Sequence, residues 1–447
     1  RKALAEREVL LKSAPHIMWP LRFVMPHDPS MRPVWLIRIG LFLYDHLARR
    51  EMLPASGTVD LHRHPAGAPL QPRFTKGFVY SDGWVDDARL VVLCALDAAE
   101  RGATVLTRTA CIDARRGAEH WSATLAAADG STREVTARAL VNATGPWAAQ
   151  FLADRAHARD DVALRLVKGS HIVVPRLFAH DHAYIFQNPD GRIIFAIPYE
   201  GAFTLIGTTD IEHHGPIGEA RADAAEIAYL CEQASRYFAQ PVTPDAVVWT
   251  YSGVRPLLDD ESGNPAAVTR DYRLELDRGG GDRQAPLLSV WGGKITIFRK
   301  LAEEVADTLA PVLAPQVRLG RAWTADAHLP GGDLRAALGA EAPAAADVTG
   351  SFTRFVARLE SRHPDAGPAL VRRLARAYGT RAEALLSAPQ GEEVAPGLFA
   401  AELAYLRCTE WALSGDDVLW RRSKLGLHLD PAQRDAVAVW MAAATRS

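Results

Sequence analysis

The strongest constraint on the fold is a change in the hydrophobic pattern along the chain. Between about residues 70 and 310, short runs rich in β-branched residues alternate with stretches of helical periodicity. Beyond about residue 350 only helical patterns occur. We therefore expect an α/β or α+β unit followed by an all-helical C-terminal domain. The 447 residues are enough for two or three such domains.

The expected elements can be placed by residue range. Asp86 is the expected N-cap of a helix that continues to Glu100. Strand candidates include 103–109, 137–142, 164–168, 171–174, 193–197, 204–208, 247–250 and 287–290. Helices beyond the boundary are expected near 352–362, 369–378, 398–412, 416–427 and 431–444.

A domain boundary is expected where the pattern changes. Residues 330–350 are rich in Ala, Gly and Pro and show no clear amphipathic face. We predict a strand-bearing part in residues 1–314, a linker in 315–350 and a helical domain in 351–447.

Charge and cysteine content exclude some classes of function. Lys plus Arg (51) nearly balance Asp plus Glu (53), so no overall positive charge favours nucleic acid as a partner. The four cysteines, Cys94, Cys111, Cys231 and Cys408, lie far apart and form no CxxC pair. This spacing argues against a zinc site or a disulfide framework and suits a reducing compartment.

One apolar segment, residues 33–46, invites two interpretations. It contains PVWLIRIGLFLYDH and is too short and too interrupted by Arg38 to cross a bilayer. We slightly favour a helix buried in a protein core. The alternative is an amphipathic helix at a membrane interface, bounded by Trp35 and Tyr44 and followed by Arg49 and Arg50.

Two glycine-containing turns follow predicted strands. Ala143, Thr144 and Gly145 end one strand, where small residues let a ligand approach the backbone. Gly292 and Gly293 stand before a helix, whose first N–H groups favour negative charge. Each pattern is equally compatible with an ordinary turn.

Arginine, lysine and histidine side chains near other strands could bind or react. Arg255, fixed by Pro256, suits two-point capture of a phosphate or carboxylate, and Arg270 lies close in sequence. A surface salt bridge would explain Arg255 equally well. Lys168 and His171 flank Gly169 between two β segments; His171 is a candidate acid or base, although a structural role is commoner for such a histidine.

Taken together and in order, these segments resemble the FAD-dependent glycerol-3-phosphate dehydrogenases of the aerobic, respiratory type. The similarity extends from Ala3 to the C-terminus. It is carried by YSDGWVDDARL (80–90), VLTRT (105–109), LVNATGPW (140–147), LVKGSHIVVP (166–175), LIGTTD (205–210), WTYSGVRPL (249–257), TRDY (269–272), GGKIT (292–296) and DDVLWRRSKLGL (416–427).

The resemblance implies an FAD oxidoreductase fold like that of D-amino-acid oxidase. An FAD domain made of separated segments and a substrate domain with a mixed sheet would be interleaved within residues 1–314, followed by the helical domain. It also implies oxidation of sn-glycerol 3-phosphate to dihydroxyacetone phosphate by hydride transfer to FAD, with electrons passed to a membrane quinone. Such a protein is expected in the cytoplasm, attached peripherally to the inner membrane, and a homodimer is also compatible.

The resemblance further assigns roles to particular residues. Arg255 would hold the phosphate, Arg270 would be its second contact, and Lys294 would lie beside flavin and substrate. His171 would belong to the catalytic group. The start of the helix would face the pyrimidine end of the flavin, and the earlier turn would line the nucleotide side of the cofactor. The residues concerned are Gly292, Gly293, Ile295 and Thr296 for the first, and Ala143, Thr144 and Gly145 for the second.

The sequence departs from the family pattern in two places. The family opens with a strand, a GxGxxG turn and a helix that hold the FAD pyrophosphate, then a segment that contributes an active-site histidine and arginine; the printed sequence contains neither. We therefore expect these 447 residues alone to bind FAD weakly or not at all. Ile297 and Phe298 also replace the usual Thr-Tyr pair. An oxygen-using glycerol-3-phosphate oxidase and a fragment without catalytic activity remain alternatives.

Overall fold

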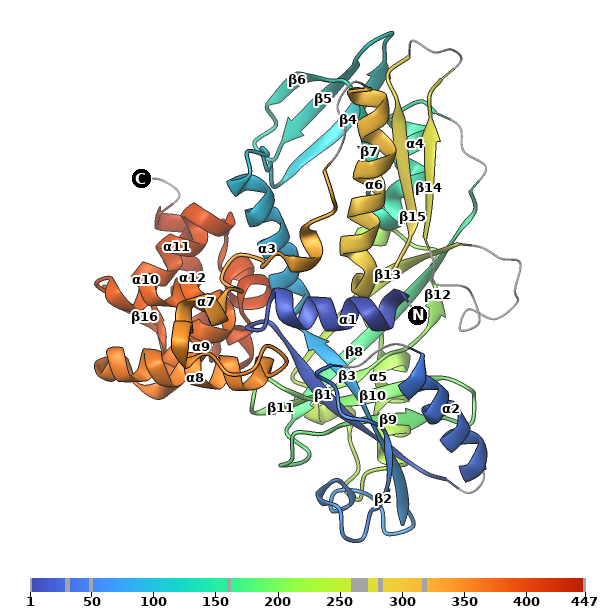
Figure 1. Cartoon of the computed structure of the whole chain (residues 1–447), viewed down its shortest axis with the longest axis vertical. Helices are drawn as coiled ribbons and strands as arrows, with labels where there is room; N and C mark the ends of the chain where they lie inside the picture. The colour runs from blue at the N-terminus through green and yellow to red at the C-terminus, as the bar shows by residue number, and fades with distance from the viewer. Residues whose placement is uncertain are drawn as a thin grey trace.

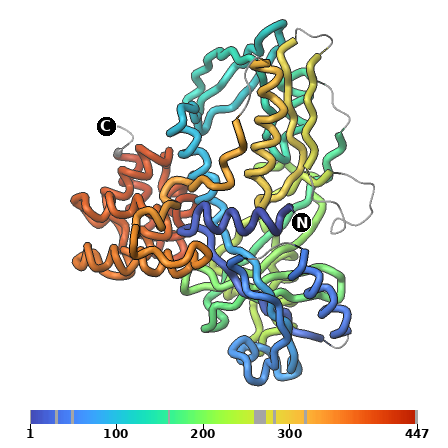
Figure 2. Tube along the Cα trace, viewed as in Figure 1, coloured from blue at the N-terminus to red at the C-terminus, as the bar shows by residue number. Residues whose placement is uncertain are grey.

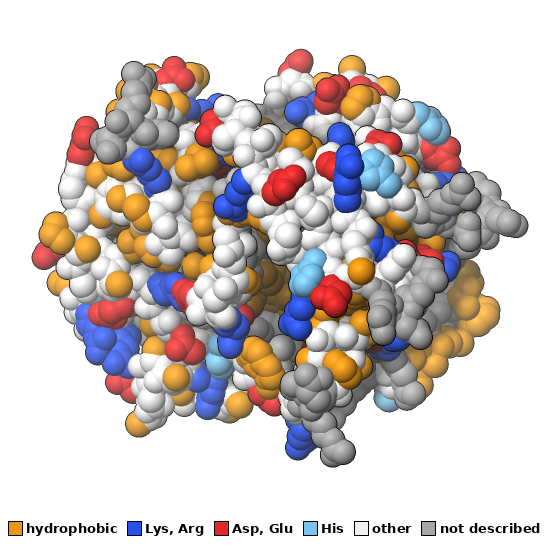
Figure 3. Space-filling view, turned by 90° about the horizontal axis from the view of Figure 1, so that it is seen from above, with side chains coloured by type: hydrophobic (Ala, Val, Ile, Leu, Met, Phe, Trp, Pro, Cys, Tyr) orange, Lys and Arg blue, Asp and Glu red, His pale blue; other side chains and the backbone are white. Residues whose placement is uncertain are grey.

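The computed structural model describes residues 2–28, 33–47, 51–158, 162–258, 272–279, 284–315 and 320–444. A strand-bearing part forms most of the molecule, and a compact group of helices from the C-terminal third lies against one side of it (Figures 1 and 2). Basic and acidic side chains are interspersed on the face shown in Figure 3.

Strands and helices have the following bounds. The strands are β1 Met18–Pro26, β2 Gly57–Asp60, β3 Lys76–Val85, β4 Thr109–Arg116, β5 Trp121–Ala127, β6 Thr132–Ala137, β7 Leu140–Asn142, β8 Leu164–Pro175, β9 Ala183–Gln187, β10 Ile193–Tyr199, β11 Phe203–Gly207, β12 Ile211–Glu212, β13 Trp249–Leu258, β14 Tyr272–Asp277, β15 Leu287–Gly292, β16 Glu393–Ala395 and β17 Leu398–Phe399. The helices are α1 Lys2–Ser13, α2 Val34–His46, α3 Asp87–Glu100, α4 Ala148–Asp154, α5 Ala224–Ser235, α6 Phe298–Leu313, α7 Leu334–Leu338, α8 Val348–Arg362, α9 Pro368–Tyr378, α10 Ala382–Ser387, α11 Ala400–Glu410 and α12 Pro431–Ala444.

The largest sheet has nine strands and is mixed, as predicted. Its order is β12-β8-β11-β10-β9-β1-β3-β2, and β13 pairs with β8. The β1–β9 pair is parallel, whereas the other pairs in this sheet are antiparallel. Helix α5 contacts β8, β10 and β11, and buried side chains such as Ile172, Phe186 and Leu230 fill the space between. This packing fixes the strands that carry His171 and Arg255.

A smaller sheet holds the two glycine turns. Its order is β14-β15-β7, and β15 runs parallel to β7. A separate antiparallel sheet consists of β4, β5 and β6. Trp121 and Trp291 are almost fully buried in the core that joins these sheets to α4.

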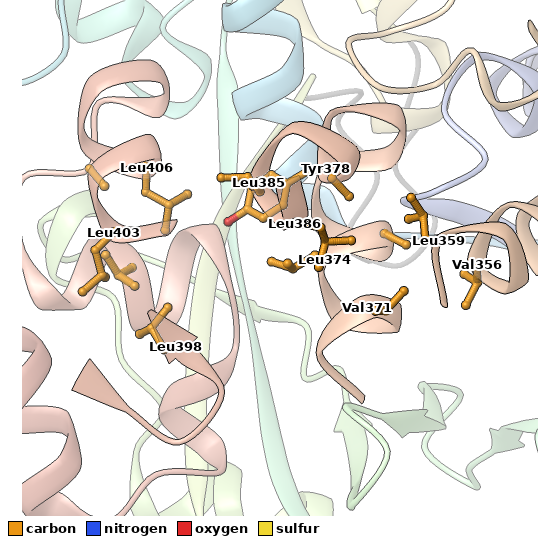
Figure 4. Close-up of a cluster of buried hydrophobic side chains, with 14 of the residues drawn as sticks. Val356, Leu359, Val371, Leu374, Tyr378, Leu385, Leu386, Leu398, Leu403 and Leu406 are labelled. Atoms are coloured by element: carbon orange, nitrogen blue, oxygen red, sulfur yellow. The ribbon is translucent and has the colours of Figure 1, made fainter. Parts of the chain in front are cut away.

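The C-terminal helices enclose their own hydrophobic core. Figure 4 shows side chains of α8 to α11, including Leu359, Leu374, Leu403 and Leu406, turned toward one another. The prediction that this part contains no strands is wrong, because β16 and β17 form a short antiparallel ribbon around Pro396-Gly397. Gly397 has a φ of +70°, which suits glycine in a tight turn.

Several further predictions can be compared with the structure. Segment 103–109 is not a strand: β4 begins only at Thr109, and within the described residues no strand pairs with 103–108. The two strands predicted around Gly169 are one continuous strand, β8. Helix α3 begins as expected, with Asp86 accepting a bond from the Arg89 amide. Helix α7 lies within the predicted 315–350 linker, and its Leu334 and Leu338 are buried in the helical core.

Helix α2 is not buried, so the favoured interpretation of residues 33–46 is wrong. None of its residues is buried, and Trp35 and Phe42 are 63% and 60% exposed. Its contacts with the main sheet are made from one face: Tyr44 hydrogen bonds to the Ser81 carbonyl, and Asp45 accepts bonds from Ser56. Within the described parts of the chain, no helix is both long and apolar enough to cross a bilayer.

Candidate active site

The two glycine turns lie side by side although they are far apart in sequence. Strand β7 pairs in parallel with β15, with Leu140 opposite Leu287 and Asn142 opposite Ser289. The carboxyl ends of both strands therefore meet at one edge, where ligands of open α/β sheets bind. Ala143, Thr144 and Gly145 leave the first strand, and Gly292 and Gly293 leave the second.

The second turn is built for close backbone approach. Gly292 and Gly293 have φ values of +68° and +105°, which favour glycine. Lys294 follows them and is exposed; its carbonyl accepts a bond from the Ile297 amide, whereas its side chain has no partner among the described residues. Ile295 is exposed and Thr296 half-buried, while Ile297 is anchored in the protein. The turn thus offers backbone N–H groups and one uncommitted cation.

The first turn is held rigidly by a buried asparagine. The Asn142 side chain donates to the Ala148 carbonyl (2.9 Å) and accepts from the Thr144 hydroxyl (2.7 Å). Gly145 has a φ of +59°. Ala143 and Thr144 remain exposed, so the small residues at the strand end are accessible.

Arg255 forms a partly buried ion pair with Asp210 inside a polar cluster. It donates to Asp210 Oδ1 (2.5 Å) and to the Thr208 hydroxyl (3.3 Å). Its guanidinium lies over Gly169, because a Cβ at that position would come within 2.7 Å of both terminal nitrogens. The side chain is only 33% exposed. The planar group is therefore held in one orientation, as two-point binding of an anion requires.

His171 lies on the same face of the sheet as Arg255. Its ring stacks on Tyr251 with centroids 4.8 Å apart and planes 4° apart. Burial, and then the charge of Arg255, lowers the pKa of His171 to about 4. Its Nδ1 is buried and has no partner in the described structure. His171 is consequently a neutral imidazole at pH 7.

A carboxylate beneath the sheet supports both groups. Glu226 is 2% exposed and accepts bonds from the hydroxyls of Ser170 (2.8 Å) and Thr209 (2.9 Å) and from Lys168 (2.8 Å). Burial opposes its ionisation, but these bonds, with one from the Asp223 amide, lower the pKa of Glu226. Thr209 lies between Thr208 and Asp210, the two residues that bind Arg255. Because Glu226 binds the Thr209 hydroxyl, it fixes the segment that carries both of them.

Sequence reasoning missed Glu226 and gave no role to Asp210. The Asp223-Glu226 spacing matches a capping box, which the structure contains. That signal predicts a helix start but not the polar network, which depends on the position of α5 under β8. Asp210 lies in the quoted LIGTTD segment, where only tertiary contact with Arg255 reveals its function.

The two groups of residues belong to neighbouring elements. Strand β13, which carries Arg255, contacts β15 and the short 3-10 helix η2, Gly145–Trp147. The cluster around Arg255 and the edge with the two glycine turns therefore belong to elements in contact. Arg270 lies outside the described residues. Among those described, no cluster of His, Cys, Asp and Glu has the arrangement of a metal site.

Comparison with known proteins gives the class first. Residues 1–296 match the model of the FAD dependent oxidoreductase family. A glycerol-3-phosphate dehydrogenase of Bacillus halodurans, solved with FAD, superimposes with a TM-score of 0.78 at 26% identity, covering 99% of this chain and 81% of that one. The chain belongs to the FAD-dependent oxidoreductases.

Sequence relatives define the group more closely. A glycerol-3-phosphate dehydrogenase of Pseudomonas aeruginosa is 48% identical over 97% of this chain and 81% of the relative. A D-erythritol 1-phosphate dehydrogenase of Brucella abortus is 47% identical, and the aerobic glycerol-3-phosphate dehydrogenase of Escherichia coli 45%, each over 98% of this chain and 85% of the relative. The resemblance to the FAD-dependent glycerol-3-phosphate dehydrogenases is thus confirmed, and so are the expected fold class and FAD as cofactor.

The described residues fit such a cofactor. Two turns with positive-φ glycines lie at the carboxyl ends of adjacent parallel strands. Lys294, at the second turn, provides a positive charge with no protein partner in the described structure. An extended dinucleotide could contact both turns at once.

Proposed function

We propose that this enzyme oxidises sn-glycerol 3-phosphate at C2 to dihydroxyacetone phosphate. The observation that carries the proposal is the pairing of an oriented, half-buried guanidinium, Arg255, with a neutral imidazole, His171, on one sheet face. A substrate with a phosphate at one end and a hydroxyl near the other matches these two groups. The names of the P. aeruginosa and E. coli relatives support the same substrate.

The residues divide the work of the reaction. Arg255 binds the phosphate, with Arg270 as its proposed second contact, and thereby orients the substrate carbon chain. His171 can accept the proton of the C2 hydroxyl. FAD supplies the acceptor for the hydride that leaves C2. Lys294 lies where its charge can stabilise the negative charge that reduction brings.

Anaerobic reduction tests the substrate. Because these 447 residues alone are expected to bind FAD weakly, the enzyme is first saturated with FAD and its bound flavin is measured. It is then mixed with glycerol 3-phosphate without oxygen, and the flavin absorbance is followed while dihydroxyacetone phosphate is assayed. Bleaching with equimolar product supports the proposal. Stable absorbance with substrate in large excess contradicts it.

D-erythritol 1-phosphate is the second candidate substrate. The B. abortus relative that carries this activity in its name is 47% identical, against 48% for the P. aeruginosa enzyme. Both compounds carry a phosphate for Arg255 and differ in chain length. Comparing kcat/KM for the two decides between them.

We further propose that electrons pass to a membrane quinone and that the enzyme attaches peripherally to the inner face of the cytoplasmic membrane. The exposed apolar side chains of α2 support this location. An oxidase that uses oxygen directly is the alternative. Stopped-flow reoxidation of the reduced enzyme by a soluble quinone and by oxygen separates them, since a dehydrogenase reacts much faster with the quinone.

A further inference from the structure

Gly253 is a strand glycine that neither backbone conformation nor packing explains. It lies in the middle of β13 and is not among the residues with positive φ. It is exposed, and a Cβ added there would meet no heavy atom within 4 Å. A glycine inside a strand weakens the strand and often marks a place where a ligand approaches the backbone.

Strand register places Gly253 between the two groups of the candidate site. Gly253 pairs with Gly169, Tyr251 with His171, and Arg255 with Val167. Alternate residues of a strand share one face. The Gly253–Gly169 pair and the stacked His171 and Tyr251 rings are therefore neighbouring cross-strand pairs on the same face of the sheet. Arg255 reaches back along the strand, and its guanidinium lies over Gly169.

The two glycines have different surroundings. A Cβ at Gly169 would come within 2.7 Å of both Arg255 terminal nitrogens and 2.6 Å of the Thr208 hydroxyl. A Cβ at Gly253 would enter open space. Gly169 therefore gives room to the arginine, whereas Gly253 has open space above it. Steps on one strand face are about 7 Å apart, a separation that a short phosphorylated polyol can bridge.

We propose that Gly253 is the floor of the substrate site beneath the carbon chain of the phosphorylated polyol, between the Arg255 guanidinium and the His171 ring. The inference rests on the proposed function and adds a specificity-determining residue to it. Gly169 has the separate role of letting Arg255 lie flat above β8. The methyl group of an alanine at each position should thus disturb a different part of the same ligand.

The test uses the FAD-loaded enzyme, with whichever of glycerol 3-phosphate and D-erythritol 1-phosphate the wild type oxidises better. Gly253→Ala should lower kcat/KM about tenfold or more, while the inhibition constant of inorganic phosphate stays within about twofold of the wild-type value. Gly169→Ala should instead raise the inhibition constant of inorganic phosphate, because the new Cβ displaces Arg255. A merely structural effect on the strand would change both kcat/KM for the phosphorylated polyol and the inhibition constant of inorganic phosphate.

Gly57→Ala is the matched control. Gly57 is another exposed strand glycine with no heavy atom near its added Cβ, and it lies on β2 at the far edge of the sheet. Its kinetics and FAD content should match those of the wild type. An unchanged kcat/KM in Gly253→Ala, or a loss explained by FAD content, overturns the inference. If the wild-type enzyme oxidises neither compound, the proposed function is wrong, and the role of Gly253 that rests on it is rejected as well.

Discussion

At the scale of single residues, the guanidinium of Arg255 is oriented by an ion pair with the Asp210 carboxylate. Arg255→Ala would remove the cation and leave the Asp210 carboxylate, 2.5 Å from it at present, facing the substrate phosphate. We expect KM for glycerol 3-phosphate to rise by an amount that corresponds to a loss of about 1.5–3 kcal/mol of binding free energy, with a smaller fall in kcat. Steady-state kinetics measure this, with glycerol as a substrate that lacks the phosphate. Equal losses for both substrates would show that Arg255 does not hold the phosphate.

Two further variants separate charge from shape at this position. Arg255→Lys keeps the charge but not the planar two-point contact, so it should recover only part of the affinity. Asp210→Asn keeps the size of the side chain and removes its charge. If Asp210 only competes with phosphate for Arg255, Asp210→Asn should increase the affinity of the enzyme for inorganic phosphate. If Asp210 orients the guanidinium, the same change should decrease that affinity.

Lys294 should affect catalysis rather than binding. Its side chain makes no bond to another described residue, and its charge matters most when negative charge develops on the flavin. Lys294→Ala should lower kcat by about a hundredfold, shift the flavin reduction potential downward, and change KM little. Redox titration alongside kinetics checks this. An unchanged kcat would remove Lys294 from the site.

His16 makes the stability of the fold depend on pH. It is fully buried, and neither ring nitrogen has a partner in the described structure. Burial, followed by the charges of Arg89, Arg376 and Arg381, lowers the pKa of His16 from 6.5 to about 3. Between these values the unfolded chain binds a proton that the folded protein does not, so stability is lost as pH falls below 6.5.

We expect the wild type to lose more stability on acidification than His16→Leu. The difference should be about 1.2 kcal/mol between pH 6 and pH 5. Urea unfolding of both proteins at the two pH values measures it. Parallel pH profiles would mean that His16 titrates normally.

At the scale of elements, a buried ion pair joins the two parts of the molecule. Arg89 on α3 binds both carboxylate oxygens of Glu410 on α11, and both side chains are at most 2% exposed. Glu410→Ala would leave a buried, unpaired guanidinium and should lower the free energy of unfolding by about 3–5 kcal/mol. Glu100→Ala, which breaks the exposed Arg381–Glu100 pair between the same parts, should lower it by less than about 1 kcal/mol. Similar losses in the two variants would contradict this assignment.

Helix α2 is the proposed membrane contact and can be tested separately. The double change Trp35→Asp and Phe42→Asp should abolish sedimentation with vesicles of bacterial lipid and leave activity with a soluble quinone unchanged. Val439→Asp is the control, because Val439 is 69% exposed on α12. If Val439→Asp instead releases the protein, the C-terminal helices make the contact.

Helices with caps were more predictable from the sequence than strands that need partners. Asp86 marks the start of α3 by itself, because its side chain accepts a bond from the Arg89 amide. Segment 103–109 has the composition of a strand, but a strand also needs a neighbour, which local sequence does not specify. For α2, periodicity showed an apolar face but not what that face meets.

At the scale of the whole molecule, the sequence predicted which residues could form the site better than how they are held. The small residues at 143–145, the Gly292-Gly293 pair, Arg255 and His171 all carry local signals. Their proximity depends on parallel pairing of β7 with β15 and on the register of β8 against β13. The contacts of Asp210 and Glu226 and the open space over Gly253 follow only from tertiary structure, because single-residue patterns contain no distances between elements.

The parallel pairing of β7 with β15 also determines when the cofactor edge can form during synthesis. Residues 143–286, including the strands that carry His171 and Arg255, lie between these two strands. At ordinary translation speeds, β7 leaves the ribosome on the order of ten seconds before β15. During that interval β7 lacks its pairing with β15, and the edge lacks its second glycine turn. The cofactor can contact both turns only after β15 and the two glycines at its end have emerged, so the two-turn edge forms after the strands that carry His171 and Arg255 have been made.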